Sequence, residues 1–171
     1  METIYLAGQI CEDKGSHVWR EGATEILEAM GFGVINPAAN HFNRELMGRT
    51  ENNGEEFLRL AIEQSQGILI DKDHALVKKS DIVLVNLQTF PSFKPMVGTL
   101  FELAWCYDDK RPVIGITDDG PYSRHPFIQR TLSGKAGSVL EACRLIERLY
   151  CVAVKDPDKR QVALWREGLH P

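Results

Sequence analysis

The sequence lacks the residue patterns that mark several common classes of site. None of its four cysteines belongs to a C-x-x-C pair and no histidine cluster accompanies them, so neither a zinc site nor a disulfide framework is indicated. No G-x-G-x-x-G follows the first predicted strand and no G-x-x-x-x-G-K-[ST] occurs, which excludes the usual dinucleotide and triphosphate sites. There is also no H-E-x-x-H and no nucleophile elbow. We therefore expect no metal and no cofactor.

The chain also lacks a basic excess and a long apolar run. Its formal charge of -4 argues against binding to a nucleic-acid polymer through phosphate attraction. No stretch approaches the roughly 18 apolar residues of a membrane span, and the N-terminus has no signal-peptide pattern. We expect a cytoplasmic protein that does not associate with membranes. The length of 171 residues predicts one domain over residues 1–154, followed by a charged tail over residues 155–171 that is either loosely ordered or contacts a neighbouring subunit.

Apolar patterning predicts strands that alternate with helices. Short β-rich runs predict strands over residues 3–7, 31–36, 82–87 and 112–117. Apolar residues at three- and four-residue steps predict helices over residues 16–30, 55–66, 99–107 and 134–149. Ser16 is a candidate N-cap of the first helix. Residues 68–79 fit either a short strand over 68–70 or a helix, with the helix favoured beyond Asp73. This alternation predicts an α/β fold with an open parallel sheet.

Residues that follow the predicted strands are candidates for a ligand site. In an open parallel sheet, ligands bind beyond the carboxyl ends of the strands. These positions hold Gly8, Gln9, Asn36, the loop after Leu87, and Thr117 to Asp119. Near the first helix, Ser16 and Arg20 are placed to hold a phosphate at a helix N-terminus, although a solvated helix face explains Arg20 equally well.

Glu102 is the strongest candidate for chemistry, and two interpretations fit it. Thr99 and Glu102 have the T-x-x-E spacing of a capping box, in which the glutamate closes the first helical turn. The alternative rests on the surrounding F-E-L-A-W, which places one carboxylate among apolar residues at the ligand edge of the sheet. Desolvation there would tune a carboxylate for nucleophilic or acid-base work. Gly98 and Thr99, which open this segment, are then candidate substrate-binding residues.

A second carboxylate, Asp73, would complete a pair. Cleavage of a glycosidic bond commonly uses one carboxylate as nucleophile and another as proton donor. Asp71 or Asp73 also fits a helix N-cap, however. Asp81 precedes a predicted strand, so we expect it to be structural and remote from the ligand. Tyr5 lies in the middle of the first predicted strand, where a tyrosine is usually part of the core, but its phenol is also suited to orient a carboxylate.

Several segments, in this order and spacing, resemble the nucleoside 2-deoxyribosyltransferase family. They are I-Y-L-A-G, the W-R of the first helix, G-F-G-V-I-N-P, S-D-I-V-L-V-N-L with Asp73 eight residues before its aspartate, and V-G-T-L-F-E-L-A-W-C-Y-D-D-K-R-P-V-I. The resemblance covers residues 3–117. It implies a flavodoxin-like open parallel sheet with helices on both faces. It also implies a double displacement at the anomeric carbon of a 2'-deoxynucleoside.

The resemblance implies a role for each of three side chains. The family's nucleophile falls on Glu102, its proton-handling aspartate on Asp73, and the tyrosine that hydrogen-bonds the nucleophile on Tyr5. Attack by Glu102 would give a covalent glycosyl-enzyme, from which a second base takes the sugar. Family members are commonly homo-oligomers whose sites borrow residues from a neighbour. We therefore expect a dimer or larger homo-oligomer, with a nucleoside or nucleotide and a free nucleobase as small-molecule partners.

One departure from the family pattern keeps other functions open. Transferases of the family often carry an acidic residue just before the V-G of the nucleophile helix, where this chain has Met96. The family also includes N-glycosidases of nucleoside 5'-monophosphates, whose phosphate Ser16, His17 and Arg20 would hold here. The first prediction is a deoxyribosyltransferase, and the alternative is such a (deoxy)nucleotide hydrolase with the same nucleophile. A third is a non-catalytic nucleotide-binding module in which Glu102 is only a cap.

Overall fold

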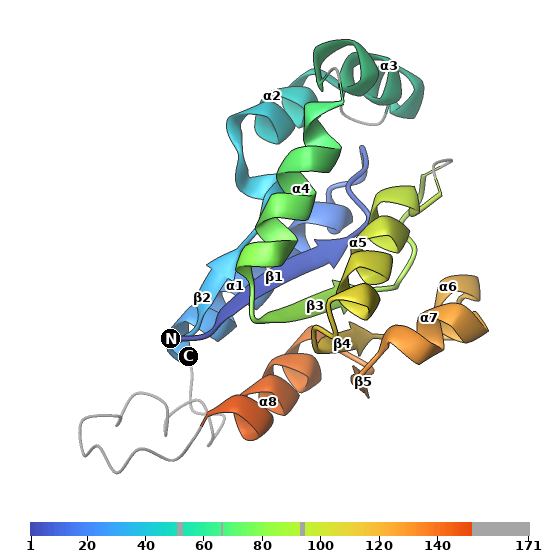
Figure 1. Ribbon diagram of the computed structural model, residues 1–171. Coiled ribbons are helices and arrows are strands. Elements are labelled where there is room, and N and C mark those ends of the chain that lie inside the picture. Colours follow the sequence, from blue (N-terminus) through green and yellow to red (C-terminus); the bar gives the residue numbers. More distant parts are fainter. Residues whose placement is uncertain (51–52, 66, 93–94, 152–171) are drawn as a thin grey trace.

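The computed structural model describes residues 1–50, 53–65, 67–92 and 95–151, and a parallel β-sheet forms its centre (Figure 1). The strands are β1 (Thr3–Gly8), β2 (Gly33–Ile35), β3 (Ile82–Asn86), β4 (Val113–Ile116) and β5 (Gly134–Ala136). They lie in the order β2-β1-β3-β4-β5, and each neighbouring pair is parallel. This is the flavodoxin-like strand order, so the predicted fold class is confirmed. The predicted tail over residues 155–171 lies outside the described residues.

Helices cover both faces of the sheet (Figure 1). They are α1 (Gly15–Ala29), η1 (Pro37–Ala39, a short 3-10 helix), α2 (His41–Thr50), α3 (Gly54–Ser65), α4 (Ile68–Lys79), α5 (Val97–Asp108), α6 (Pro121–Arg124), α7 (Pro126–Thr131) and α8 (Val139–Tyr150). Of the two alternatives for residues 68–79, the structure has the helix. No helix in the described ranges combines the length and the apolar character needed to cross a membrane.

The two faces follow from the alternation of side chains along a strand. In β1, Ile4 and Leu6 are buried in the core that α1 and α8 cover. Tyr5 and Ala7 point to the opposite face and are buried in the core shared with α4, α5 and α7. The centre of the sheet is buried on both faces, as expected for parallel strands. A tyrosine at position 5 therefore faces the layer that contains α5.

The ends of β1 and β3 define the two edges of the sheet. At the carboxyl edge, Gly8 of β1 lies opposite Asn86 of β3, where the strand order reverses and a ligand crevice is expected. At the other edge, Oδ2 of Asp81 accepts a 2.7 Å hydrogen bond from the backbone N–H of Thr3. This bond ties the starts of the two strands together and confirms the structural role expected of Asp81.

The predicted helix starts that differ from the structure include those of α8 and α1. The helix predicted over residues 134–149 begins only at Val139, because residues 134–136 form the edge strand β5 and Ser138 is the N-cap. The N-cap of α1 is Lys14 rather than Ser16. Ser16 lies inside the first turn, and its hydroxyl donates a 2.7 Å hydrogen bond to the carbonyl of Asp13.

Helix α2 lies in a polar segment for which the sequence predicts no element. Leu46 of α2 packs with Phe57 and Leu60 of α3 in a small cluster that is separate from the two cores on the sheet. Figure 1 shows α2 and α3 side by side at one end of the molecule, beyond α4. Because α2 has little apolar surface, tertiary packing of these few side chains rather than its own propensity accounts for its helical structure.

Candidate active site

Tyr5 and Glu102 meet between β1 and α5. The Tyr5 hydroxyl donates a 2.6 Å hydrogen bond to Oε1 of Glu102. Tyr5 has no exposed surface and Glu102 is 7% exposed, so the bond is nearly sealed from solvent. A charge-assisted bond of this length holds the carboxyl group in one orientation and leaves Oε2 for other contacts.

The capping-box interpretation of Glu102 is wrong. Helix α5 begins at Val97, and its N-cap is Met96. Thr99 is therefore the third residue of the helix, whereas a capping box would require it at the N-cap. Glu102 lies one turn further along the helix, beyond the first-turn N–H groups that a capping carboxylate would bond. Its position serves the contact with Tyr5 instead.

Burial dominates the electrostatics of Glu102. Desolvation raises the pKa of its carboxyl to about 8, although the hydrogen bond from Tyr5 opposes this shift. The nearby charge of Asp73 raises the pKa of Glu102 further, and Arg20 and Lys72 lower it. Burial, followed by the Glu102 charge, also raises the pKa of Tyr5 far above its usual range, so the phenol stays a donor. Perturbed carboxyl groups of this kind are typical of functional sites.

Asp73 supplies a second carboxyl group to the same site. It lies inside α4, whose N-cap is Gly67, so neither Asp71 nor Asp73 is the predicted N-cap. Burial raises the pKa of Asp73, and the ammonium of Lys72, 3.1 Å from Oδ1, opposes that rise. Two carboxyl groups with different surroundings can divide nucleophilic and proton-transfer roles between them.

Both carboxyl groups line a pocket of about 370 Å³ at the carboxyl edge of the sheet. Six of the predicted site residues line it: Gly8, Gln9, Asp73, Gly98, Thr99 and Glu102. Most of the remaining wall is apolar and comes from α2, α3, α4 and α5, through residues that include Phe42, Leu46, Phe57, Leu69, Met96 and Trp105. The walls therefore suit a largely uncharged group that can lie beside the carboxyl groups of Glu102 and Asp73.

Gly8 allows the first strand to turn beneath this pocket. Its φ of 153° is a conformation that side chains disfavour. A Cβ at this position would also lie 3.0 Å from the Trp19 ring and 3.2 Å from the carbonyl oxygen of Asn86. The close approach of the three segments explains why a glycine ends the strand.

Three predicted substrate-binding residues lie outside the pocket wall. Arg20 is fully buried, and its guanidinium donates to the backbone carbonyls of Leu6, Gly8, Gln9 and Ser16. Ser16 is also fully buried, with its hydroxyl bonded to the carbonyls of Cys11 and Asp13. Asn36 is the N-cap of η1, and its Oδ1 accepts from the N–H of Ala38 at 3.0 Å. The structure gives all three residues backbone partners within the protein.

Sequence reasoning missed Lys72 and the contribution of α2 and α3. Lys72 lies directly before Asp73 and is one-third exposed, so its cation reaches both the pocket and the carboxyl group. Its adjacency to Asp73 is visible in the sequence and was a usable signal. The α2 and α3 side chains gave no such signal, because their part in the pocket depends on long-range packing. Within the described ranges, no three metal-ligating side chains cluster in a way that would hold an ion.

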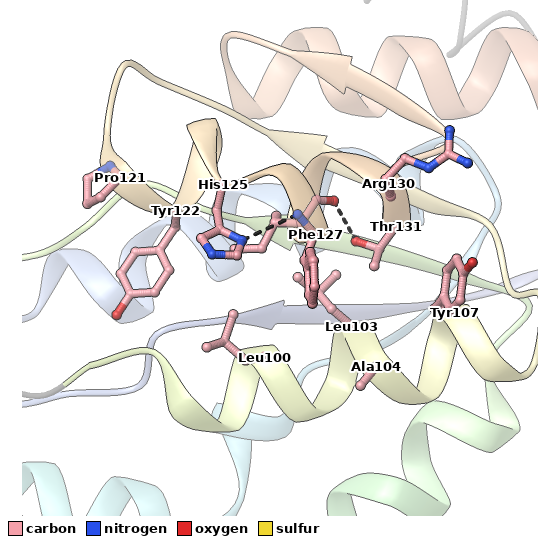
Figure 2. A pocket seen from close by; sticks show the side chains of 11 residues that line it. Leu100, Leu103, Ala104, Tyr107, Pro121, Tyr122, His125, Phe127, Arg130 and Thr131 are labelled. Carbon is pink, nitrogen blue, oxygen red and sulfur yellow. Dashed lines mark hydrogen bonds between the residues drawn. The ribbon is translucent and has the colours of Figure 1, made fainter.

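A larger hollow lies on the other side of α5 and has a different character. This apolar groove, about 690 Å³ in volume, runs between α5 and the α6–α7 segment (Figure 2). Its walls include Leu100, Leu103, Tyr107, Tyr122, Phe127 and Ile128, and no carboxyl group lines it. Of these two hollows, only the smaller pocket is lined by Glu102 and Asp73.

The chain is similar to known proteins in sequence and in structure. The family model described as "Nucleoside 2-deoxyribosyltransferase" matches residues 4–153. Among solved structures, the chain is similar to a 2-desoxiribosyltransferase from Leishmania mexicana, at 16% identity over 68% of this chain and 66% of that one, with a TM-score of 0.46. It is also similar to a 3-dehydroquinate dehydratase-like protein from Bifidobacterium longum, at 12% identity over 87% and 98% of the two chains, with a TM-score of 0.42. No curated protein matches the chain by sequence.

Proposed function

The chain belongs to the nucleoside 2-deoxyribosyltransferase family, and we propose that it transfers the sugar of a 2'-deoxynucleoside from one base to another through a glycosyl-glutamate intermediate. The observation that carries this proposal is the 2.6 Å bond between Tyr5 and Glu102 at the pocket that also contains Asp73. A buried carboxyl group oriented by a phenol, with a second carboxyl group nearby, is suited to double displacement at an anomeric carbon.

The proposed first step breaks the bond between the sugar and the departing base. Oε2 of ionised Glu102 attacks the anomeric carbon, and the electron pair of the N-glycosidic bond goes to the base. Asp73 donates a proton to that base as it leaves. The products are a free base and a covalent ester between the sugar and Glu102. Tyr5 keeps its bond to Oε1 throughout, which leaves the other oxygen free to react.

The second step reverses the first with a different base. A ring nitrogen of the incoming base attacks the anomeric carbon, and the electron pair of the ester bond returns to Glu102. Asp73, now ionised, takes the proton that the incoming nitrogen loses. If water attacks in place of the base, the same steps give hydrolysis.

The charges around the pocket favour a neutral nucleoside over a 5'-monophosphate. Arg20 and Ser16, the predicted phosphate ligands, donate to backbone carbonyls and are buried. Lys72 is the single cation among the described residues that line the pocket, and it is already paired with Asp73. A dianionic phosphate would therefore enter without an unpaired cation to receive it, which is costly in a largely apolar site.

One assay tests the proposal. The protein is incubated with a deoxynucleoside, and separately with its 5'-monophosphate, each with and without a free acceptor base, and the products are separated by chromatography. We expect a new nucleoside that needs both deoxynucleoside and acceptor. Sugar phosphate released from the monophosphate alone, without transfer, would instead assign the hydrolase function.

A pair of matched variants tests the role of Glu102. Glu102→Gln keeps an acceptor for the Tyr5 hydroxyl but removes the nucleophile, so turnover should be lost while the fold remains. Glu28→Gln makes the same change at an exposed position on α1 and should leave the rate unchanged. Wild-type turnover by Glu102→Gln would refute the mechanism. Intact-protein mass spectrometry of the wild type with substrate should detect the sugar adduct, and peptide mapping after digestion should place it on the peptide that contains Glu102.

The family resemblance also leads us to propose a homo-oligomer. Sedimentation velocity of the full chain tests this directly, because a dimer or larger assembly sediments faster than a monomer of 19.3 kDa. A single monomeric species at micromolar concentration would contradict the proposal without affecting the assignment of the catalytic residues.

A further inference from the structure

Met96 lies directly before α5 and lines the proposed catalytic pocket. It is the N-cap residue of α5, and its own side chain makes no capping hydrogen bond. Its side chain is 2% exposed and lines the catalytic pocket next to Gly98 and Thr99. Six residues further along the same helix lies Glu102. The position of Met96 therefore affects both the pocket wall and the start of the helix that carries the proposed nucleophile.

Tyr122 fixes this residue from outside the pocket. The backbone N–H of Met96 donates a 3.0 Å hydrogen bond to the Tyr122 hydroxyl, which belongs to α6. Figure 2 shows Tyr122 at one end of the apolar groove, with its hydroxyl directed toward the start of α5. The carbonyl of Met96 accepts from the N–H of Leu100 at 3.1 Å. The backbone of Met96 is thus held on one side by Tyr122 and on the other by α5 itself.

Tyr122 is itself well anchored. Its ring packs against the core that contains Leu103 and Ile128. The next residue, Ser123, is buried, and its hydroxyl donates to Oδ1 of Asp118 at 2.8 Å while it accepts from the N–H of Asp118 at 3.0 Å. These bonds fasten α6 to the end of β4. A fixed hydroxyl on a packed ring is well suited to hold a loop in one conformation.

We propose that Tyr122 is a positioning residue for the transfer reaction, acting through Met96 on the wall of the substrate pocket. The inference rests on the proposed function. Loss of the hydroxyl would leave the N–H of a buried residue without this acceptor and would loosen the turn before α5. Substrate binding would then have to order the wall. The Tyr5–Glu102 pair lies further along the helix and keeps its own bond, so the chemical step should change less than binding.

Two phenylalanine variants test the proposal. Tyr122→Phe removes the hydroxyl that holds Met96. Tyr107→Phe is the matched control, because Tyr107 lines the same groove from α5 but lies at its opposite end and is 56% exposed (Figure 2). We expect Tyr122→Phe to raise the KM for the deoxynucleoside about three- to tenfold, the effect of one lost hydrogen bond, with kcat changed less than twofold. Tyr107→Phe should match the wild type in both constants.

The outcomes separate this inference from the proposed function. If the wild type transfers sugar and Tyr122→Phe has the same KM as Tyr107→Phe, the positioning role is refuted. A lower melting temperature without a change in KM refutes it as well, because Tyr122 would then be only structural. A wild type that neither transfers nor hydrolyses would refute the proposed function instead. In that case, amide hydrogen exchange at residues 96–100 tests the contact between Tyr122 and Met96. Faster exchange in Tyr122→Phe alone supports the contact, and equal exchange in both variants overturns it.

Discussion

The Tyr5 hydroxyl donates to Oε1 of Glu102 across 97 positions of sequence, and both groups are buried. The bond joins the first strand of the sheet to the helix that follows the third. Because it stabilises the ionised carboxyl group, it opposes the burial that would otherwise keep Glu102 protonated. The balance between these two effects sets the pH at which the proposed nucleophile is available.

We expect activity to rise with pH through the titration of Glu102. The proposed nucleophile must be ionised, and burial raises its pKa to about 8. With a 2'-deoxyribosyl substrate whose leaving group needs no proton from Asp73, kcat/KM, which reports groups of the free enzyme, should therefore rise with pH toward a plateau above about pH 8. Tyr5→Phe removes a bond that lowers this pKa, so the rising limb should move to higher pH. An unchanged limb in Tyr5→Phe, as expected for the control Tyr107→Phe, would contradict this account.

The same titration predicts a pH-dependent gain in stability for Glu102→Gln. The folded-state pKa of Glu102 is raised from 4.5 to about 8, so the folded protein holds this proton more tightly than the unfolded chain. That contribution to stability is complete below the unfolded pKa and is lost as pH rises toward 8, with a slope approaching about 1.4 kcal/mol per pH unit. The free energy of unfolding can be measured with urea at pH 5 and pH 9. Relative to the wild type, that of Glu102→Gln should be higher at pH 9 than at pH 5 by about 2 kcal/mol or more. A constant difference across this range would show that Glu102 is not strongly desolvated.

Lys72 should control the protonation of Asp73. Burial raises the pKa of Asp73, and the Lys72 ammonium opposes this, so Lys72→Met should raise the pKa further. Arg20 and Glu102 also act on Asp73 through their charges, and neither residue is changed in the Lys72→Met or Lys79→Met variant. Carboxyl-carbon NMR titration would measure the shift directly. Lys79→Met, at the exposed end of the same helix, is the control and should leave the Asp73 titration in place.

Arg20 should be important for stability. Its guanidinium satisfies four backbone carbonyls in a fully buried position and stacks 4.6 Å from the centre of the Trp19 ring. Arg20→Met leaves those carbonyls without their donor, and we expect a loss of about 3 kcal/mol or more in the free energy of unfolding. Arg144→Met, on the exposed side of α8, should cost within about 0.5 kcal/mol. Equal urea midpoints for the two variants would refute this role.

Two similar motifs show how much the sequence can predict here. Thr99 and Glu102 have the spacing of a capping box but do not form one, because α5 begins two residues earlier. Ser138 and Glu141 have the same spacing, and in this case Ser138 is the N-cap. The Ser138 hydroxyl accepts from the N–H of Glu141 at 3.2 Å, and the Glu141 carboxylate accepts from the N–H of Gly137 at 2.9 Å. Spacing alone could not separate the two cases, because the start of each helix depends on the loop before it.

The long apolar strands were predictable, whereas the short edge strand β5 and the polar helix α2 were not. The runs at β1, β3 and β4 are buried on both faces, so their composition alone predicts a strand. Strand β5 has only three residues, Gly134–Ala136, and adopts its conformation by pairing with β4. The burial of Arg20 could not be predicted from the sequence either, because an arginine between glutamate and tryptophan on an amphipathic helix is usually exposed to solvent.

The bond between Thr3 and Asp81 also has a consequence for how the protein folds. Thr3 at the start of β1 and Asp81 at the start of β3 are 78 positions apart in the sequence. The chain between them must close into a loop before the two strands can pair. Such long-range pairing costs chain entropy early and makes parallel sheets slow to form. Tyr5 and Glu102 can meet only after this closure. During refolding, recovery of catalysis should therefore trail recovery of the helical circular-dichroism signal.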